Sequence, residues 1–125
     1  LLEQSMYPTP ELAHNNLGWA QYNLGRYKKA QEHLKMAVFL KPEMCLAYNN
    51  LGLTHRELGN TAEAIENFRK SIRKCPDNYA EPHFNLGKLL QKRGQPEARR
   101  HFQSCVEIEP QTNLGERCRS YLGVR

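Results

Sequence analysis

The chain has 125 residues, 39% of them hydrophobic, and its 18 basic and 13 acidic side chains give a net charge of +5. This length supports one domain, and the apolar share is too high for a disordered chain. No stretch reaches the ~18 consecutive apolar residues that a membrane-spanning helix needs. The basic balance permits nucleic-acid binding without indicating it. Because the chain opens Leu1-Leu2-Glu3 without a Met or a signal peptide, we interpret it as a piece of a longer protein.

One residue pattern recurs about every 34 positions along the chain. Asn-Leu-Gly occurs at 16–18, 50–52 and 85–87, and the units close with Pro42, Pro76 and Pro110. A small residue and a larger apolar residue keep the same spacing, at Ala30, Ala64 and Ala98 and at Leu34, Phe68 and Phe102. This period and these residue types resemble the tetratricopeptide repeat.

The resemblance implies an all-α, right-handed solenoid in which each repeat contributes two antiparallel helices. In chain order, we expect helices near 10–24, 27–40, 44–58, 61–74, 78–93 and 96–108, followed by a capping helix near 115–122. The corresponding parts are the tail of a preceding repeat and a linker at 1–10, repeats at 11–44, 45–78 and 79–112, and the capping helix at 113–125. On that last helix, Arg117 and Arg119 are expected to point to water.

The recurring glycines and leucines have predicted structural roles. The glycine of each Asn-Leu-Gly is expected where a neighbouring helix approaches too closely for a side chain, whereas Gly25, Gly59 and Gly94 end the first helices in a left-handed conformation. The predicted core consists of Leu17, Leu24, Leu51, Leu58, Leu86, Leu89, Phe68 and Phe102.

Catalysis is disfavoured by the residues that are present. The five histidines form no pair with the spacing of metal ligands, and the four cysteines form no Cys-x-x-Cys. No glycine-rich loop suited to phosphates occurs, because every glycine has a packing or capping role in the repeat. We therefore predict no enzyme activity, no metal site and no cofactor.

The first helix of each repeat should line the concave face of the solenoid, where such arrays bind other proteins. The predicted partner-binding residues are Leu12, Asn15, Asn16, Trp19, Tyr22, Leu46, Asn49, Asn50, Leu53, Arg56, Phe84, Asn85 and Lys88.

Two features of this face have alternative explanations. Asn16, Asn50 and Asn85 form a ladder of amides that could hold an extended peptide backbone, or asparagine is simply tolerated beside Leu-Gly. Trp19, with Tyr22, belongs to an apolar strip of the kind that dominates binding energy, or it packs onto a neighbouring repeat.

Chaperone cofactors with this repeat clamp a terminal carboxylate between inward cations. At the corresponding places the first repeat here has Asn15 and Trp19 and the third has Glu81 and Asn85, so that only Asn50 matches. We therefore expect no inward cation pair, and the chemistry disfavours an Hsp70 or Hsp90 clamp. Basic residues gather instead on the second helices, among glutamates, which favours a solvated face over a nucleic-acid site.

The four cysteines suggest disulfides. Cys45 opens one helix of the second repeat and Cys75 ends the other, so an antiparallel hairpin brings them together. Cys105 takes a small core position and should face Cys118 on the capping helix. The alternative is four reduced thiols, and the pairing would indicate an exported protein.

A closer resemblance comes from the segment Met6-Tyr7-Pro8-Thr9-Pro10, which leads into Asn15-Asn16-Leu17-Gly18-Trp19. This segment resembles the pilotin family of type IV pilus biogenesis (the PilF, PilW and Tgl proteins), nearest Tgl. The resemblance implies an outer-membrane lipoprotein on the periplasmic side, anchored by a lipid outside this fragment, whose partner is a secretin subunit that it helps to localise and assemble. The alternative is a cytoplasmic peptide-binding scaffold or regulatory domain.

Overall fold

The computed structural model describes residues 9–123, and all its secondary structure in that range is α-helical. The seven helices are α1 (Pro10–Asn23), α2 (Tyr27–Leu40), α3 (Cys45–Glu57), α4 (Thr61–Lys74), α5 (Glu81–Lys92), α6 (Ala98–Ile108) and α7 (Asn113–Leu122). None of these helices is long and apolar enough to cross a bilayer. The predicted fold class, helix pairs followed by a terminal helix, is confirmed.

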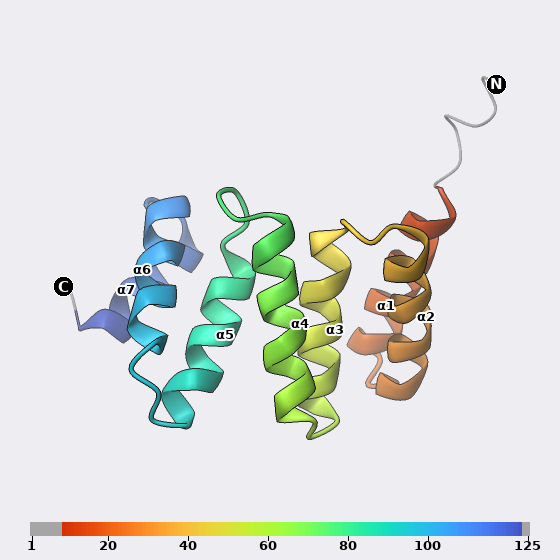
Figure 1. Cartoon of the computed structure of the whole chain (residues 1–125), viewed down its shortest axis with the longest axis horizontal. Helices are drawn as coiled ribbons and strands as arrows, with labels where there is room; N and C mark the ends of the chain where they lie inside the picture. Colours follow the sequence, from red (N-terminus) through yellow and green to blue (C-terminus); the bar gives the residue numbers. More distant parts are fainter. Residues whose placement is uncertain (1–8, 124–125) are drawn as a thin grey trace.

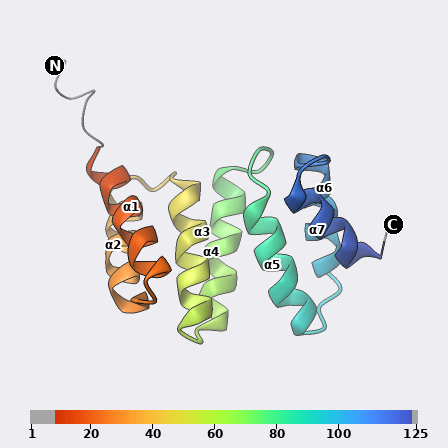
Figure 2. The ribbon, with the colours of Figure 1, turned by 180° about the vertical axis from the view of Figure 1, so that it is seen from behind.

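The helices form three antiparallel pairs stacked in a row, with α7 closing the end (Figure 1). Within the pairs, α1 packs on α2, α3 on α4 and α5 on α6, while α2 packs on α3 and α4 on α5 between neighbouring pairs. The second helices lie in front in Figure 1, and the first helices lie in front together with α7 in the reverse view of Figure 2. The first helices thus form one layer.

Helix pairs lie close together because a glycine faces a large side chain in every repeat. A Cβ at Gly18 would lie 2.6 Å from Cγ of Leu34, and a Cβ at Gly87 would lie 2.9 Å from the ring of Phe102. Either contact is too short for a real side chain, so the predicted close approach is present. Gly25 has φ +78° at the turn after α1, where other residues are strained.

The core lies between the layer of first helices and the layer of second helices. Residues at the same repeat position are buried to different extents in different repeats. Leu51 is 3% exposed and Leu86 is fully buried, because each packs against the second helix of the preceding pair. The prediction that Leu17 and Leu24 are core residues is wrong, since they are 47% and 65% exposed. The reason is that no helix pair in the described part of the chain lies against this side of α1.

Three helix starts differ from the sequence prediction by two or three residues, among them that of α7, which begins at Asn113 rather than near 115. α5 begins at Glu81 rather than near 78, which places Pro82 in the first turn, where its missing N–H is not needed. α6 begins at Ala98 rather than near 96, and Gln95–Glu97 form a tight turn with an Ala98 N–H to Gln95 C=O hydrogen bond.

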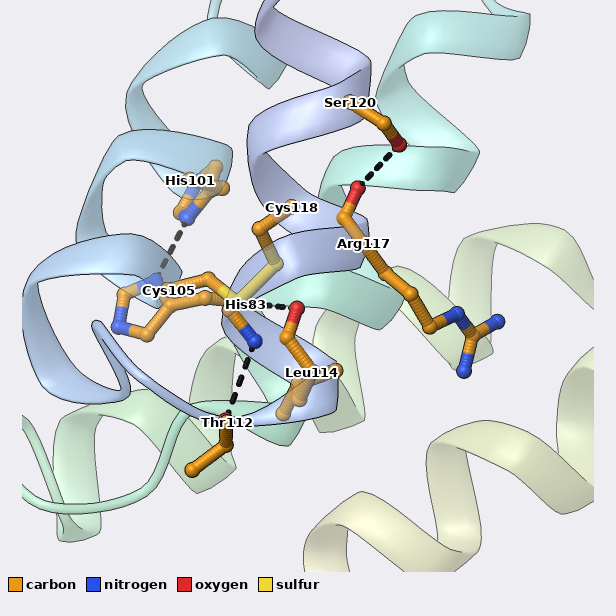
Figure 3. Close-up of a disulfide and its surroundings, with 9 residues drawn as sticks. His83, His101, Cys105, Thr112, Leu114, Arg117, Cys118 and Ser120 are labelled. Atoms are coloured by element: carbon orange, nitrogen blue, oxygen red, sulfur yellow. Dashed lines mark hydrogen bonds between the residues drawn. A yellow bond between two sulfur atoms is a disulfide. The ribbon is translucent and has the colours of Figure 1, made fainter. Parts of the chain in front are cut away.

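Both cysteine pairs considered above are disulfides in the structure. Cys45 and Cys75 join the two ends of the second hairpin with Cα atoms 5.9 Å apart. Cys105 and Cys118 join α6 to α7 with Cα atoms 6.2 Å apart, and both are fully buried (Figure 3). The N-terminus of α7 is further capped by the Thr112 hydroxyl, which accepts from the Gly115 N–H. The terminal helix is therefore held by a covalent bond and a cap.

Candidate functional site

A groove of about 650 Å³ runs along the first helices and reaches α7. It is lined by Asn15, Asn16, Trp19, Leu46, Asn49, Asn50, Leu53, Arg56, Tyr79, Glu81, Phe84, Asn85, Lys88, Asn113, Leu114 and Arg117. We refer to this surface as the concave groove. All of the predicted partner-binding residues line it except Leu12 and Tyr22.

Besides Glu81, which the sequence placed at an inward position of the third repeat but not among the predicted partner-binding residues, four lining residues were not predicted: Tyr79, Asn113, Leu114 and Arg117. Tyr79 lies in the connection before α5, and the other three lie on α7. Because these segments fall outside the first helices, the repeat period carries no information about which way their side chains point.

Apolar side chains line the part of the groove formed by α1 and α3. The Trp19 and Tyr22 rings are stacked, with centroids 5.1 Å apart and planes 7° apart. Trp19 remains 39% exposed, so part of its indole ring is open to the groove. Leu46 is also exposed and Leu53 half-buried. This arrangement offers an aromatic and aliphatic surface to an apolar side chain of a partner.

The asparagines of the groove bond to one another between repeats. The Asn50 side-chain amide donates to Oδ1 of Asn15 at 3.1 Å, and the Asn85 amide donates to Oδ1 of Asn49 at 3.1 Å. These four side chains are buried, whereas Asn16 is exposed. The predicted ladder of Asn16, Asn50 and Asn85 does not form as such, because the bonds join two separate pairs that leave Asn16 out. Each donating amide has a second N–H and its carbonyl oxygen, so the two pairs connect the repeats and keep polar groups at the groove.

The part of the groove between α5 and α7 is cationic. Nζ of Lys88 lies 4.4 Å from the Phe84 ring centroid, and Cζ of Arg117 lies 4.6 Å from the same centroid. Burial, followed by the charges of Arg56 and Arg117, lowers the pKa of Lys88. The expectation that no inward cation pair exists is therefore wrong. Arg117 is exposed, as expected from the sequence, and it also lines the groove. Figure 3 shows Arg117 leaving α7 on the side opposite the disulfide.

A second polar cluster lies away from the groove, between α4, α5 and α6. Arg69 donates two hydrogen bonds to Glu97, at 2.7 and 3.1 Å, and Nε2 of His101 lies 3.2 Å from the same carboxylate. These bonds lower the pKa of Glu97 to about 2. The Nδ1 atoms of His83 and His101 are 3.0 Å apart, and burial is the main cause that lowers the pKa of His83 to about 4.

This cluster connects neighbouring repeats, because Arg69 lies on α4 and Glu97 lies just before α6. In the described part of the chain, no group of three or more His, Cys, Asp or Glu side chains is arranged to hold a metal ion.

The stacked helix pairs, the glycine contacts and the concave groove define a helical-repeat protein. Family models of the tetratricopeptide repeat match residues 12–44 and 43–111, so the chain belongs to the tetratricopeptide repeat (TPR) family. This family consists of non-enzymatic scaffolds for protein–protein interaction. No curated protein matches the chain.

Solved structures include similar chains. MamA is 27% identical over 82% of this chain and 60% of its own length, with a TM-score of 0.75, so the present chain spans about three fifths of it. The TPR domain of Arabidopsis OM64 is 19% identical, with a TM-score of 0.81, and the match covers 91% of this chain and 94% of that domain. The second TPR domain of Spaghetti (RPAP3), bound to the HSP90 peptide SRMEEVD, is 17% identical, with a TM-score of 0.76, and the match covers 81% of this chain and 94% of that domain. The last two likenesses concern the fold alone.

Proposed function

We propose that this chain is a non-enzymatic adaptor whose concave groove binds an extended segment of a partner protein. The observation that carries the proposal is the apolar strip formed by exposed Trp19 and Leu46 and half-buried Leu53, beside hydrogen-bonding amides in one groove. Apolar groups provide binding energy and amides fix a peptide backbone, which is the combination that an extended segment requires. The peptide bound to the TPR domain of RPAP3 supports this use of the fold.

The finer proposal is that the chain acts as a pilotin-like factor and that its partner is a secretin subunit of the type IV pilus. Its support is the resemblance of residues 6–19 to that family, of which residues 6–8 lie outside the described part of the chain. The two disulfides also suit a periplasmic location. A lipid anchor outside this fragment would then hold the protein at the outer membrane.

The groove proposal is tested with overlapping labelled peptides that span the secretin subunit of the source organism, measured by fluorescence anisotropy. Trp19→Ala should weaken binding of a positive peptide about tenfold, as expected for an aromatic hot spot. The matched control is Phe39→Ala, because Phe39 is an aromatic residue that is 79% exposed and does not line the groove. Equal losses in both variants would argue against the groove.

A cytoplasmic peptide-binding scaffold is the second candidate function. The oxidation state of the four cysteines distinguishes it from an exported, pilotin-like protein. In protein isolated from its native host, alkylation and intact mass should find no free cysteine if the chain is exported. Four free thiols would favour the cytoplasmic scaffold, whatever the peptide experiment shows.

A further inference from the structure

A second surface of the molecule carries exposed apolar side chains. It belongs to α2, in the layer of second helices that lies in front in Figure 1, whereas the concave groove runs along the first helices, which lie in front in Figure 2. Near the end of α2, Phe39 is 79% exposed, and Met36 and Leu40 are 42% and 44% exposed. Because residues three and four apart share a helix face, these three side chains form one surface, which we call the α2 patch.

The repeat period shows that the α2 patch departs from the rest of the array. One repeat later, on α4, the corresponding positions are occupied by the cations Lys70, Arg73 and Lys74. Of these three, only Arg73 has an ion-pair partner among the described residues, which is Glu66 at 3.5 Å. At 79% exposure, the Phe39 ring buries little apolar area within the chain, so packing does not account for its presence.

Lysines surround the α2 patch. Lys28, Lys29 and Lys35 lie on α2, Lys41 follows its last residue, and all four are exposed. The helix itself carries one acidic residue, Glu32. None of the four lysines forms an ion pair within the part of the chain that the structure describes.

The lysines and the apolar residues lie on the same side of α2. Lys28, Lys35 and Phe39 are spaced by seven and four residues, which is the spacing of one helix face. One outward face of the array therefore combines a protruding aromatic ring with unneutralised cations.

A bilayer surface with anionic head groups fits both parts of this face. Apolar side chains that protrude from a helix insert at the level of the head groups, and lysines reach the phosphates with their flexible side chains. Each such lysine adds to the attraction of an anionic membrane. Phe39 protrudes and does not line the groove, so it is placed to enter another phase rather than to receive a side chain.

Protein partners fit this face less well. A stable protein interface buries about 800 Å² on each side around an apolar core, which three side chains at the end of one helix do not supply. A second copy of this chain, related by a two-fold axis, would bring the same lysines of both copies together, and like charges repel.

From this geometry we infer that the α2 patch and its lysines dock the protein on an anionic phospholipid surface, with Phe39 at the level of the head groups. The concave groove lies on the opposite layer, so it would stay open to a partner segment. The inference concerns another face of the molecule and does not depend on the proposed function of the groove.

The chain offers a direct probe of this orientation, because Trp19 is its only tryptophan and lines the groove. In the variant Trp19→Phe/Phe39→Trp, the single indole lies in the α2 patch instead. Both proteins are mixed with vesicles of phosphatidylcholine and phosphatidylglycerol that contain brominated acyl chains. The emission of the variant should shift to the blue and be quenched by bromine, whereas the emission of wild-type Trp19 should stay unchanged.

Flotation with unlabelled vesicles of the same composition measures the affinity. Phe39→Gln should lower the partition coefficient about tenfold, because an apolar side chain is lost from the interface. The matched control is Leu24→Gln, since Leu24 is 65% exposed at the end of α1 in the other layer. This control should bind like the wild type, and both variants should keep the wild-type thermal unfolding.

The charge requirement has its own pair of variants. Lys35→Gln/Lys41→Gln should weaken binding about twentyfold, because each lysine near an anionic surface contributes about fivefold. Lys92→Gln/Arg93→Gln removes the same charge from exposed residues at the end of α5, in the layer of first helices, and should change binding by less than about twofold. Vesicles of phosphatidylcholine alone should bind the wild type only weakly.

Four results would overturn the inference. Absence of flotation together with an unchanged emission of Trp19→Phe/Phe39→Trp would exclude the lipid surface. Equal binding to neutral vesicles would exclude the role of the lysines, and an equal loss in the Lys92/Arg93 control would mean general charge attraction. A wild-type dimer in sedimentation that Phe39→Gln dissociates would assign the α2 patch to a second copy. None of these results would change the outcome expected for peptide binding in the groove.

Discussion

Leu17, Leu51 and Leu86 occupy the same place in the three repeats, but only the last two are buried. Alanine at any of these positions removes the same atoms, so the variants isolate the effect of the neighbouring helix pair. Leu51 packs with Ala30 and Leu34, and a cavity would remain among these side chains. We therefore expect Leu51→Ala to cost about 3 kcal/mol and Leu86→Ala about as much.

Leu17→Ala should cost about 1 kcal/mol, because roughly half of the side chain already contacts water and no closed cavity forms. The assay is urea unfolding of the oxidised protein at pH 7, with the denaturant dependence checked for a constant slope. If Leu17→Ala were as costly as Leu51→Ala, α1 would be covered in solution and the assignment of its exposed face would be incorrect.

Three further perturbations test other parts of the structure. Replacing Cys105 and Cys118 with Ser should lower stability by about 3 kcal/mol in urea unfolding, as expected for closing a loop of this size, and an unchanged midpoint would mean that α7 is held otherwise. Burial lowers the pKa of His83 to about 4, so between pH 6.5 and 4 the unfolded chain binds a proton that the folded chain does not. The free energy of unfolding should therefore fall by about 2 kcal/mol over this range, and His83→Tyr should flatten the profile of stability against pH. Hydrogen bonds lower the pKa of Glu97 to about 2, so above pH 4.5 the wild type should be more stable than Glu97→Gln by about 1 kcal/mol, allowing for solvent screening. This difference in stability should shrink towards pH 2, and a difference that stays constant with pH would exclude the charge of Glu97 as its cause.

The lining of the concave groove also depends on the position of α7. Arg117 belongs to the helix that closes the solenoid, yet its guanidinium lies over a ring of the third repeat. A closing helix is required because the last pair would otherwise expose its apolar face. In this chain the same helix also extends the groove, so one element covers the last helix pair and supplies part of the groove lining.

The sequence by itself determined the helix pairs. Each repeat carries its own turn glycine, its own small residue at a helix contact and its own terminal proline, and these act within a few turns of the chain. The positions that line the concave groove on α1, α3 and α5 follow from the same period, because residues three and four apart share a helix face.

Only the tertiary structure determined which matching positions of the repeats have the same surroundings. Leu17 and Leu51 share the local sequence Asn-Asn-Leu-Gly, but their burial depends on whether another helix pair lies alongside, which is information that no single repeat contains. Likewise, Arg117 joins Lys88 over Phe84 only because α7 packs against the third pair. Burial and charge are set by neighbours distant in the sequence, and a local pattern cannot specify them.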